Sequence, residues 1–364
     1  MKDSKRFAVY TLILVIACLA AGIALLKRFQ TLRMSRVSVR TADVLPRFKP
    51  DEAEEIKISW RVLTTTLRKK NGSWVVAERG DLPADPSKIN AFLESVRTMR
   101  PLKIIAPADR ATMSRLRVAA EEPDPKIVPG IRFVIRNGKS ESLMDLVMGR
   151  GHFVNLPDDM TPQEQRVPDG RYLSIAKPDG SNIVFLTPTV FEDFHPVTGT
   201  WLQAPVFRNI AYALRMEFRQ MPQKNPVWMI FRSGKTPNFT AFGPGNHTVS
   251  RQAVLTICRI LSSHYIADAR FRSQYKDLEP AFASFSVEDS FGVIRTLRFH
   301  RLKNDSRKIL FTVEASLAKG KKVGEDARKA VEEFTAGREN VCYEITAQVF
   351  DLLKTPPFEQ PKKQ

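Results

Sequence analysis

Two stretches of this chain share one predicted plan, and that repetition constrains the fold more than any other feature. The first stretch, Glu55–Ile105, predicts two strands, at Glu55–Val62 and Leu67–Ala77. A helix follows Leu82-Pro83-Ala84-Asp85-Pro86, and an exit strand lies at Leu102–Ile105. A similar unit recurs between about Ala213 and Ala269. The sequence therefore predicts that the larger part of the chain is built twice from one module.

The helix of each stretch begins with a recognisable cap. Asp85 followed by Pro86 matches an N-cap with proline at the first helical position. Ser250 takes the place of Asp85 in the second stretch, before a helix predicted over Arg251–Ser262. We therefore interpret Asp85 as a cap and not as a catalytic carboxylate. Trp74, in the strand before the first helix, is expected to pack in the core rather than to stack on a ligand.

The cysteines leave two interpretations open. In the helix register set by the caps, Cys258 occupies the position of Leu93, which favours a buried core thiol. Cys342 lies in a predicted strand, and a Cys258–Cys342 disulfide remains the alternative in an oxidising compartment. No CxxC pair is present, so the sequence gives no indication of a zinc site.

The elements between and after these stretches are mostly strands. We predict a helix over Asp109–Val118 capped by Asp109, and hairpins formed by 131–136 with 142–148 and by 171–176 with 182–186. Further predicted elements are a short helix over Thr187–Phe194, strands within 282–314, a helix over Asp326–Thr335 and a last strand over Val341–Val349. The predicted fold class is α+β: an N-terminal transmembrane helix followed by two similar α+β units, with antiparallel sheets and helices packed on one side.

The transmembrane prediction rests on Phe7–Leu26, which contains no charged residue. At helical rise its roughly 20 residues span about 30 Å, the thickness of one bilayer core. A cleaved signal peptide needs a shorter apolar core, and a lipoprotein with Cys18 as its anchor needs a polar segment after the cysteine. A permanent single span is the interpretation that fits best.

The chain is accordingly divided into six segments. These are a cytoplasmic N-terminus at 1–6, the span at 7–26, a basic juxtamembrane linker at 27–50, repeat units at 51–207 and 208–353, and a disordered tail at 354–364. Basic residues flank the span on both sides, and long domains cross membranes largely regardless of charge. Charge alone therefore leaves the orientation of the span open.

The net charge of the chain is +18, which favours anionic partners such as lipid head groups, acidic envelope polymers or nucleic acid. The positive charge is spread along the chain, with no long basic block beyond the N-terminal fifth. This distribution disfavours nucleic-acid binding.

A search for chemistry gives no catalytic, cofactor-binding or metal-binding residue to name. The sequence contains no GxSxG elbow, no phosphate-binding loop and no HExxH frame. Its five histidines are scattered, at His152, His195, His247, His264 and His300. Gly243-Pro244-Gly245 is expected to be a turn, because its proline removes a backbone donor. Acidic pairs such as Asp158-Asp159 are expected at the solvated surface.

The order of several short motifs resembles a known family. These motifs are Lys57-Ile58-Ser59-Trp60, Gly72-Ser73-Trp74-Val75-Val76, Leu82-Pro83-Ala84-Asp85, Val147-Met148-Gly149, Arg171-Tyr172-Leu173 and the Phe185–Phe194 segment. They are similar to domain of unknown function 4340, found in bacterial single-span envelope proteins, over roughly Glu55 to Phe271. The resemblance implies an outward-facing domain that assists ABC-type transporters related to gliding motility and envelope export. It implies no catalytic residues.

Three functional hypotheses follow. The leading one is a non-enzymatic envelope protein, anchored in the bacterial inner membrane, that binds an ABC-type transporter subunit or another envelope complex. The second is a binder of acidic envelope polymers or lipids through a basic surface. The third is a hydrolase whose site residues are distributed along the sequence. No cofactor is expected under the first two.

Overall fold

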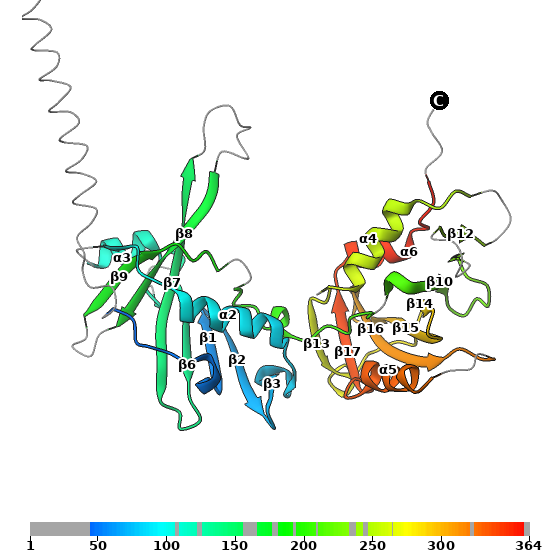
Figure 1. Ribbon diagram of the computed structural model, residues 1–364, viewed down its shortest axis with the longest axis horizontal. Helices are drawn as coiled ribbons and strands as arrows, with labels where there is room; N and C mark the ends of the chain where they lie inside the picture. Colours follow the sequence, from blue (N-terminus) through cyan, green and yellow to red (C-terminus); the bar gives the residue numbers. More distant parts are fainter. Residues whose placement is uncertain are drawn as a thin grey trace, which may run out of the picture. The chain divides into compact units, whose positions relative to one another are not determined.

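A computed structural model of the chain describes residues 44–105, 109–121, 126–155, 166–176, 181–191, 194–208, 210–232, 238–242, 247–263, 265–320 and 324–359. Its helices and strands are labelled in Figure 1. The first set comprises β1 (Glu55–Trp60), β2 (Leu63–Lys70), β3 (Ser73–Val76), β4 (Leu82–Pro83), α2 (Pro86–Thr98), β5 (Lys103–Ile105), α3 (Arg110–Leu116), β6 (Ile131–Arg136), β7 (Ser142–Asn155), β8 (Arg166–Ala176) and β9 (Asn182–Thr187).

The second set of elements follows two short 3-10 turns and begins at Ala213. It comprises β10 (Ala213–Gln220), β11 (Trp228–Phe231), β12 (Thr240–Ala241), α4 (Arg251–Leu261), β13 (Asp268–Phe271), β14 (Ala283–Asp289), β15 (Val293–Leu302), β16 (Asp305–Leu317), α5 (Glu325–Thr335), β17 (Val341–Ile345) and α6 (Ala347–Lys354). The 3-10 turns relevant below are η4 (Thr198–Trp201) and η5 (Ile210–Tyr212).

The strands form two sheets that repeat one topology. The first sheet has the order β4-β3-β2-β1-β6-β7-β8-β9-β5, and the second has the order β12-β11-β10-β14-β15-β16-β17-β13. When β4 is set aside, the two orders coincide strand for strand. In each copy the helix that follows the first strands, α2 or α4, leads to a strand that pairs antiparallel at the far edge, β5 with β9 and β13 with β17.

The caps predicted for these two helices are confirmed. Asp85 Oδ1 accepts a hydrogen bond from the Ser87 amide at 3.0 Å, and Ser250 Oγ accepts one from the Ala253 amide at 3.3 Å. Counted from the cap, the same positions are buried in both helices: Ile89 with Val254, Phe92 with Ile257, and Val96 with Leu261. The alignment of α2 with α4, counted from their N-caps, therefore matches buried positions with buried positions.

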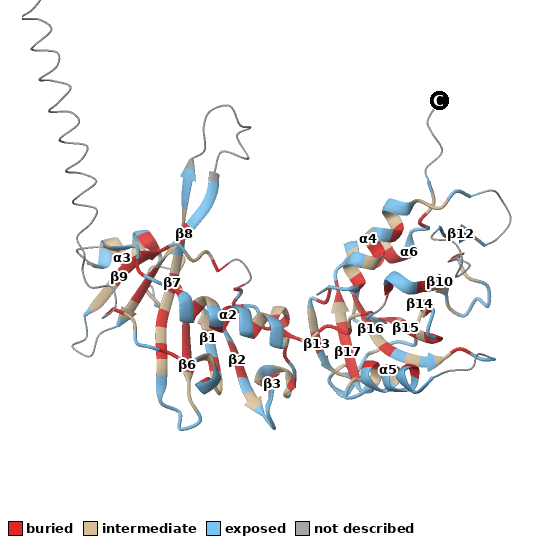
Figure 2. Cartoon of the chain, in the orientation of Figure 1, coloured by how far each residue is buried: buried red, intermediate tan, exposed pale blue. Residues whose placement is uncertain are grey.

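Two hydrophobic cores can be followed in Figure 2 as the buried residues along the strands. In the first copy, Phe92 of α2 stacks on Phe194 with ring centroids 4.8 Å apart and meets Phe133 of β6 edge-on at 5.2 Å. Trp74 is buried as predicted. In the second copy, alternate residues of β15, among them Val293, Leu297 and Phe299, face the core.

The predicted fold class is wrong in its balance of helix and strand. Phe7–Leu26 lies outside the residues that the structure describes, and within those residues no helix is long and apolar enough to cross a membrane. The described chain is dominated by two antiparallel sheets, joined by five short α-helices. The described residues therefore form a β-rich fold and not two balanced α+β units.

Three local predictions also fail, each for a physical reason. The helix expected over Thr187–Phe194 is absent from its described residues, since Thr187 ends β9 and Phe191 has a φ of 57°. The strand expected over Val341–Val349 stops at Ile345, because Thr346 caps α6 by accepting from the Val349 amide at 3.4 Å. The glycines of Gly149–His152 predict the end of a strand, but β7 continues through them, with register shifts in its pairing with β8.

By its packing the described chain divides into two compact units. One holds the described residues within 44–49, 95–130 and 144–191, and the other those within 50–94, 131–143 and 192–359. The repeat boundary predicted between 207 and 208 stays a prediction. The predicted tail, 354–364, is described as far as Glu359; Lys354 ends α6 and Phe358 forms an antiparallel bridge with Val249. The candidate site lies wholly within the second unit.

Candidate anion-binding site

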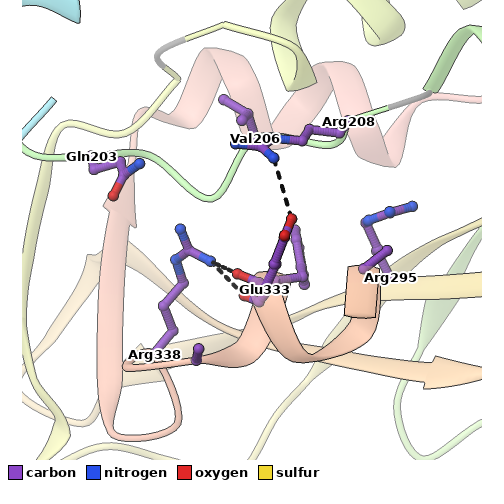
Figure 3. A pocket seen from close by; sticks show the side chains of 9 residues that line it. Gln203, Val206, Arg208, Arg295, Glu333 and Arg338 are labelled. Atoms are coloured by element: carbon purple, nitrogen blue, oxygen red, sulfur yellow. Dashed lines mark hydrogen bonds and ion pairs between the residues drawn. The ribbon is translucent and has the colours of Figure 1, made fainter. Parts of the chain in front are cut away.

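A cavity of about 570 Å³ opens between α5 and the segment 203–208 of the second unit. Figure 3 shows its side chains, with that segment on one side of the cavity and the C-terminal end of α5 on the other. The lining residues are Gln203, Val206, Arg208, Arg295, Ala330, Glu333, Phe334, Ala336 and Arg338. Three of them are arginines and one is a carboxylate, so the lining carries a net positive charge.

The end of α5 places the first arginine. Like any α-helix, α5 leaves its last carbonyls without partners inside the helix. Arg338 Nη1 donates to the carbonyl oxygens of Glu333 at 2.9 Å and Phe334 at 2.7 Å, as the dashed lines in Figure 3 show. Gly337, with a φ of 72°, lets the chain reverse between the helix and this arginine. Arg338 is therefore held against the negative end of the helix dipole.

A buried ion pair fixes the second arginine. Arg295 Nη1 lies 2.7 Å from Asp289 Oδ2, and their side chains are only 4% and 1% exposed. The other oxygen, Asp289 Oδ1, accepts hydrogen bonds from the amides of Phe291 and Val293, each at 3.0 Å. The Arg295 guanidinium also lies over the ring of Phe334, 5.7 Å from its centroid. These contacts leave Arg295 little freedom to move.

The third arginine is the most exposed of the three. Arg208 follows a segment anchored by Phe207, whose ring meets that of Phe334 edge-on at 5.4 Å. The Arg208 guanidinium lies 3.3 Å from the Glu333 carboxylate, and these two side chains are 73% and 49% exposed. An ion pair this exposed contributes about 0–1 kcal/mol and is screened by salt. Arg208 therefore holds the Glu333 carboxylate only weakly.

This arrangement is suited to binding an anion that also has an apolar part. Guanidinium groups bind carboxylates and phosphates through paired, charge-assisted hydrogen bonds. Val206, Ala330 and Phe334 give the same cavity an apolar wall. Among the described residues, the lining contains one carboxylate and no histidine or cysteine.

One sequence signal for this site exists. Arg295 stands in β15 at a core-facing position, in alternation with Val293 and Leu297, where an arginine is rarely found without a partner. The other lining residues come from segments far apart in the sequence and form no motif. The sequence search therefore missed the site.

The histidines singled out in the sequence take unrelated positions where the structure describes them. His152 Nδ1 lies 2.5 Å from Asp169 Oδ1, His247 stacks on Phe358 with centroids 4.8 Å apart, and His300 is buried. The carbonyl of His195 accepts from the indole of Trp201 at 2.8 Å. His264, Asp158-Asp159 and Gly243-Pro244-Gly245 lie outside the described residues. Within those residues, no group of three or more His, Cys, Asp and Glu is placed to hold a metal ion.

The two described cysteines are free thiols. Cys342 is buried, whereas Cys258 is partly exposed and so is not the full counterpart of the buried Leu93. Burial raises the pKa of each thiol to about 11. Both are therefore protonated and unreactive near neutral pH.

Comparisons of the chain with models of protein families, with curated proteins and with solved structures find no match. The resemblance to domain of unknown function 4340 accordingly stays a prediction from the sequence motifs.

Proposed function

We propose that this chain is a non-catalytic binding protein whose arginine-lined cavity receives an acidic side chain of a protein partner. The observation that carries the proposal is the convergence of Arg208, Arg295 and Arg338 on one cavity whose lining carboxylate, Glu333, is half exposed. A transporter subunit, the partner that the sequence resemblance implies, is the class of protein we assign to this role.

The binding step in this proposal is an exchange of carboxylates. An incoming carboxylate replaces Glu333 beside Arg208, and because that pair is solvent-exposed, its loss costs about 0–1 kcal/mol. Arg295 and Arg338 stay in place, since a buried carboxylate holds the first and helix carbonyls hold the second. Two of the three cations are thus preorganised, which lowers the ordering cost of binding.

The proposal is tested with purified full-length chain and a fluorescent 12-residue peptide rich in Asp and Glu. Its isosteric Asn and Gln version serves as the uncharged control peptide. Arg208→Gln is expected to weaken binding of the acidic peptide by about five- to tenfold, the loss typical of one charge-assisted hydrogen-bonded contact. Glu333→Gln is expected to strengthen it, because the competing carboxylate is removed.

A matched control pair lies on another strand face. Arg298 Nε and Glu314 Oε1 lie 2.5 Å apart, and their side chains are 38% and 51% exposed. Arg298→Gln and Glu314→Gln are expected to leave peptide binding unchanged. Equal effects of the site pair and the control pair would show that the peptide responds only to net charge, and the proposal would then be rejected.

A second candidate function is binding of an acidic envelope polymer, favoured by the net charge of +18. A polyanion that contacts a diffuse basic surface is released by salt and is indifferent to any single arginine. Polyglutamate titrations with wild type and Arg208→Gln separate the two functions. Binding that salt abolishes and that Arg208→Gln leaves intact supports the polymer.

A further inference from the structure

One end of the second sheet carries two exposed aromatic rings in contact. Tyr212 of η5 and Phe291 of the β14–β15 turn meet edge-on, with centroids 6.1 Å apart and planes at 78°. They are 57% and 53% exposed. Exposed aromatic pairs leave apolar area in water that a partner can cover.

The pair is held by backbone bonds rather than by its own packing. The Ser290 amide donates to the Tyr212 carbonyl at 3.0 Å, and the Phe291 amide donates to Asp289 Oδ1 at 3.0 Å. Gly292, with a φ of 80°, closes the turn. The two rings are therefore presented on a rigid support, a property shared by side chains that dominate binding energies.

Asp289 connects this aromatic pair to the cavity. One of its oxygens binds Arg295, which lines the cavity, and the other binds the amide of Phe291. Arg208 lies four residues before Tyr212 in the chain. The apolar pair and two of the three arginines, Arg208 and Arg295, thus come from the same two segments of the second unit.

The aromatic surface continues beside the pair. Arg232 donates to the carbonyl of Ala211 and lies over the ring of Phe239, 5.1 Å from its centroid. Phe231 and Phe242 are also largely exposed and meet edge-on at 6.5 Å. Aromatic and arginine side chains of this kind are enriched at the centres of protein–protein interfaces.

The corresponding end of the first sheet has a different chemistry. By the shared topology, β1 and β6 match β10 and β14. There Glu55 and Arg136 form an ion pair, Glu54 pairs with Lys69 at 3.0 Å, and the Asn137 amide donates to Glu141. Polar groups thus satisfy one another at the position where the second copy exposes rings. The aromatic pair is therefore a property of the second copy and not of the shared fold.

The charge at this end of the second sheet identifies the partner it fits. Two carboxylates here, Asp289 and Glu217, are almost fully buried against arginines. Arg208 and Arg215 remain substantially exposed. The side chains here that are at least partly exposed are thus three arginines, Arg208, Arg215 and Arg232, and two glutamates, Glu288 and Glu333. Positive charge is in excess, so the complement of this end is acidic.

We infer that Tyr212 and Phe291 form an apolar subsite next to the cavity, and that the partner is an acidic protein segment that also carries a large apolar side chain. This inference rests on the proposed function, since it assigns the carboxylate of that segment to the cavity. The apolar side chain packs against the two rings. A segment that is acidic but lacks apolar residues engages only half of the surface.

The test uses full-length chain and three synthetic peptides of equal length, two of them acidic and one uncharged. The first alternates Asp with Leu and Phe, the second alternates Asp with Ser, and the third alternates Asn with Leu and Phe. We expect the first to bind about tenfold more tightly than the second, and the third to bind most weakly. Tyr212→Ser and Phe291→Ser are expected to remove the advantage of the first peptide over the second.

A control variant separates this subsite from general surface hydrophobicity. Val227, also about half exposed, lies beside β11 at the opposite end of β10. Val227→Ser is expected to leave the binding of all three peptides unchanged. Melting temperatures confirm that each variant folds, since the substituted side chains are exposed.

The outcomes separate the two levels of the argument. If both acidic peptides bind equally, or if Tyr212→Ser and Phe291→Ser have no effect while Arg208→Gln does, the aromatic subsite is refuted and the cavity stands. If neither acidic peptide binds, the proposed function fails as well. Vesicles of anionic lipid form a further arm, and binding to them that depends on Tyr212 and Phe291 would overturn the protein-segment assignment in favour of a membrane surface.

Discussion

Replacing Asp289 with asparagine should destabilise the second unit more than any other single isosteric change at the site. The substitution keeps the size of the side chain and an oxygen for the Phe291 and Val293 amides, but it removes the charge opposite Arg295. Arg295 is then a buried cation without a counter-charge, a situation that costs about 3–5 kcal/mol. Asp289→Ala should cost about 1–3 kcal/mol more, because the buried Val293 amide loses its acceptor.

The assay is urea unfolding with the m-value monitored alongside the midpoint. Because the chain has two units, its unfolding need not be two-state. Hydrogen exchange of peptides from β14, β15 and α5 therefore serves as the local measure. Exchange in these elements should accelerate in Asp289→Asn, in proportion to the lost stability, while exchange in β7–β9 of the other unit should not change.

A double variant identifies the cause of the effect. In Asp289→Asn with Arg295→Met, no buried charge remains, so the double variant should be more stable than Asp289→Asn alone. The exposed pair provides the reference: Glu314→Gln should change stability by less than about 1 kcal/mol. A loss of less than about 1 kcal/mol in Asp289→Asn, or a double variant no more stable than the single one, would refute the reasoning.

Further predictions concern caps, pH and thiols. Asp85→Ala and Ser250→Ala should each cost about 1 kcal/mol of unfolding free energy in urea melts, because each removes an acceptor from a helix start, with Asp85→Asn nearly neutral. Burial lowers the pKa of His300, so the folded chain keeps it neutral while the unfolded chain protonates below its ordinary pKa of 6.5. Stability should therefore fall as pH drops through that value, and His300→Gln should flatten the profile of melting temperature against pH. Cys258 and Cys342, with pKa values of about 11, should resist iodoacetamide at pH 8 in the folded chain and react on addition of urea, as followed by mass spectrometry.

Local interactions explain what the sequence could predict. The caps at Asp85 and Ser250 are decided by residues two or three positions away, so the pattern of nearby residues is sufficient to recognise them. The repeated plan was visible for the same reason, because each copy brings its own helix start and apolar spacing. Its full extent, the matching order of eight strands in both sheets, depends on pairings between distant segments and required the structure.

The failed predictions show the limits of periodicity. Alternating apolar residues from Val341 to Val349 indicate a strand, but the second part of that run belongs to α6, in which Phe350 and Leu353 face the core. The single capping residue Thr346 decides between a continued strand and a new helix, whereas the alternation extends over the whole run and indicates a strand. The prediction of a helix at Thr187–Phe194 is wrong because Phe191 has a left-handed backbone conformation, which the amino-acid composition of the segment does not reveal.

The site was beyond the reach of sequence reasoning for a different reason. Arg208, Arg295 and Arg338 come from a connecting segment, a strand and a turn after a helix, and their spacing along the chain matches no motif. Arginines of this kind are common in a chain with a net charge of +18. Only Arg295, placed among core residues of β15, departs from the expected pattern.

The shared topology also sets an order for the synthesis of the chain. In each copy the edge strand is made before the strand it pairs with: Lys103–Ile105 emerges from the ribosome early and must wait for Val184–Leu186, and Asp268–Phe271 must wait for Val341–Glu344. Until then each edge strand exposes unpaired backbone groups. A chain truncated before β17 therefore lacks the pairing partner of β13, a strand made much earlier. Such a chain loses the whole far edge of the second sheet.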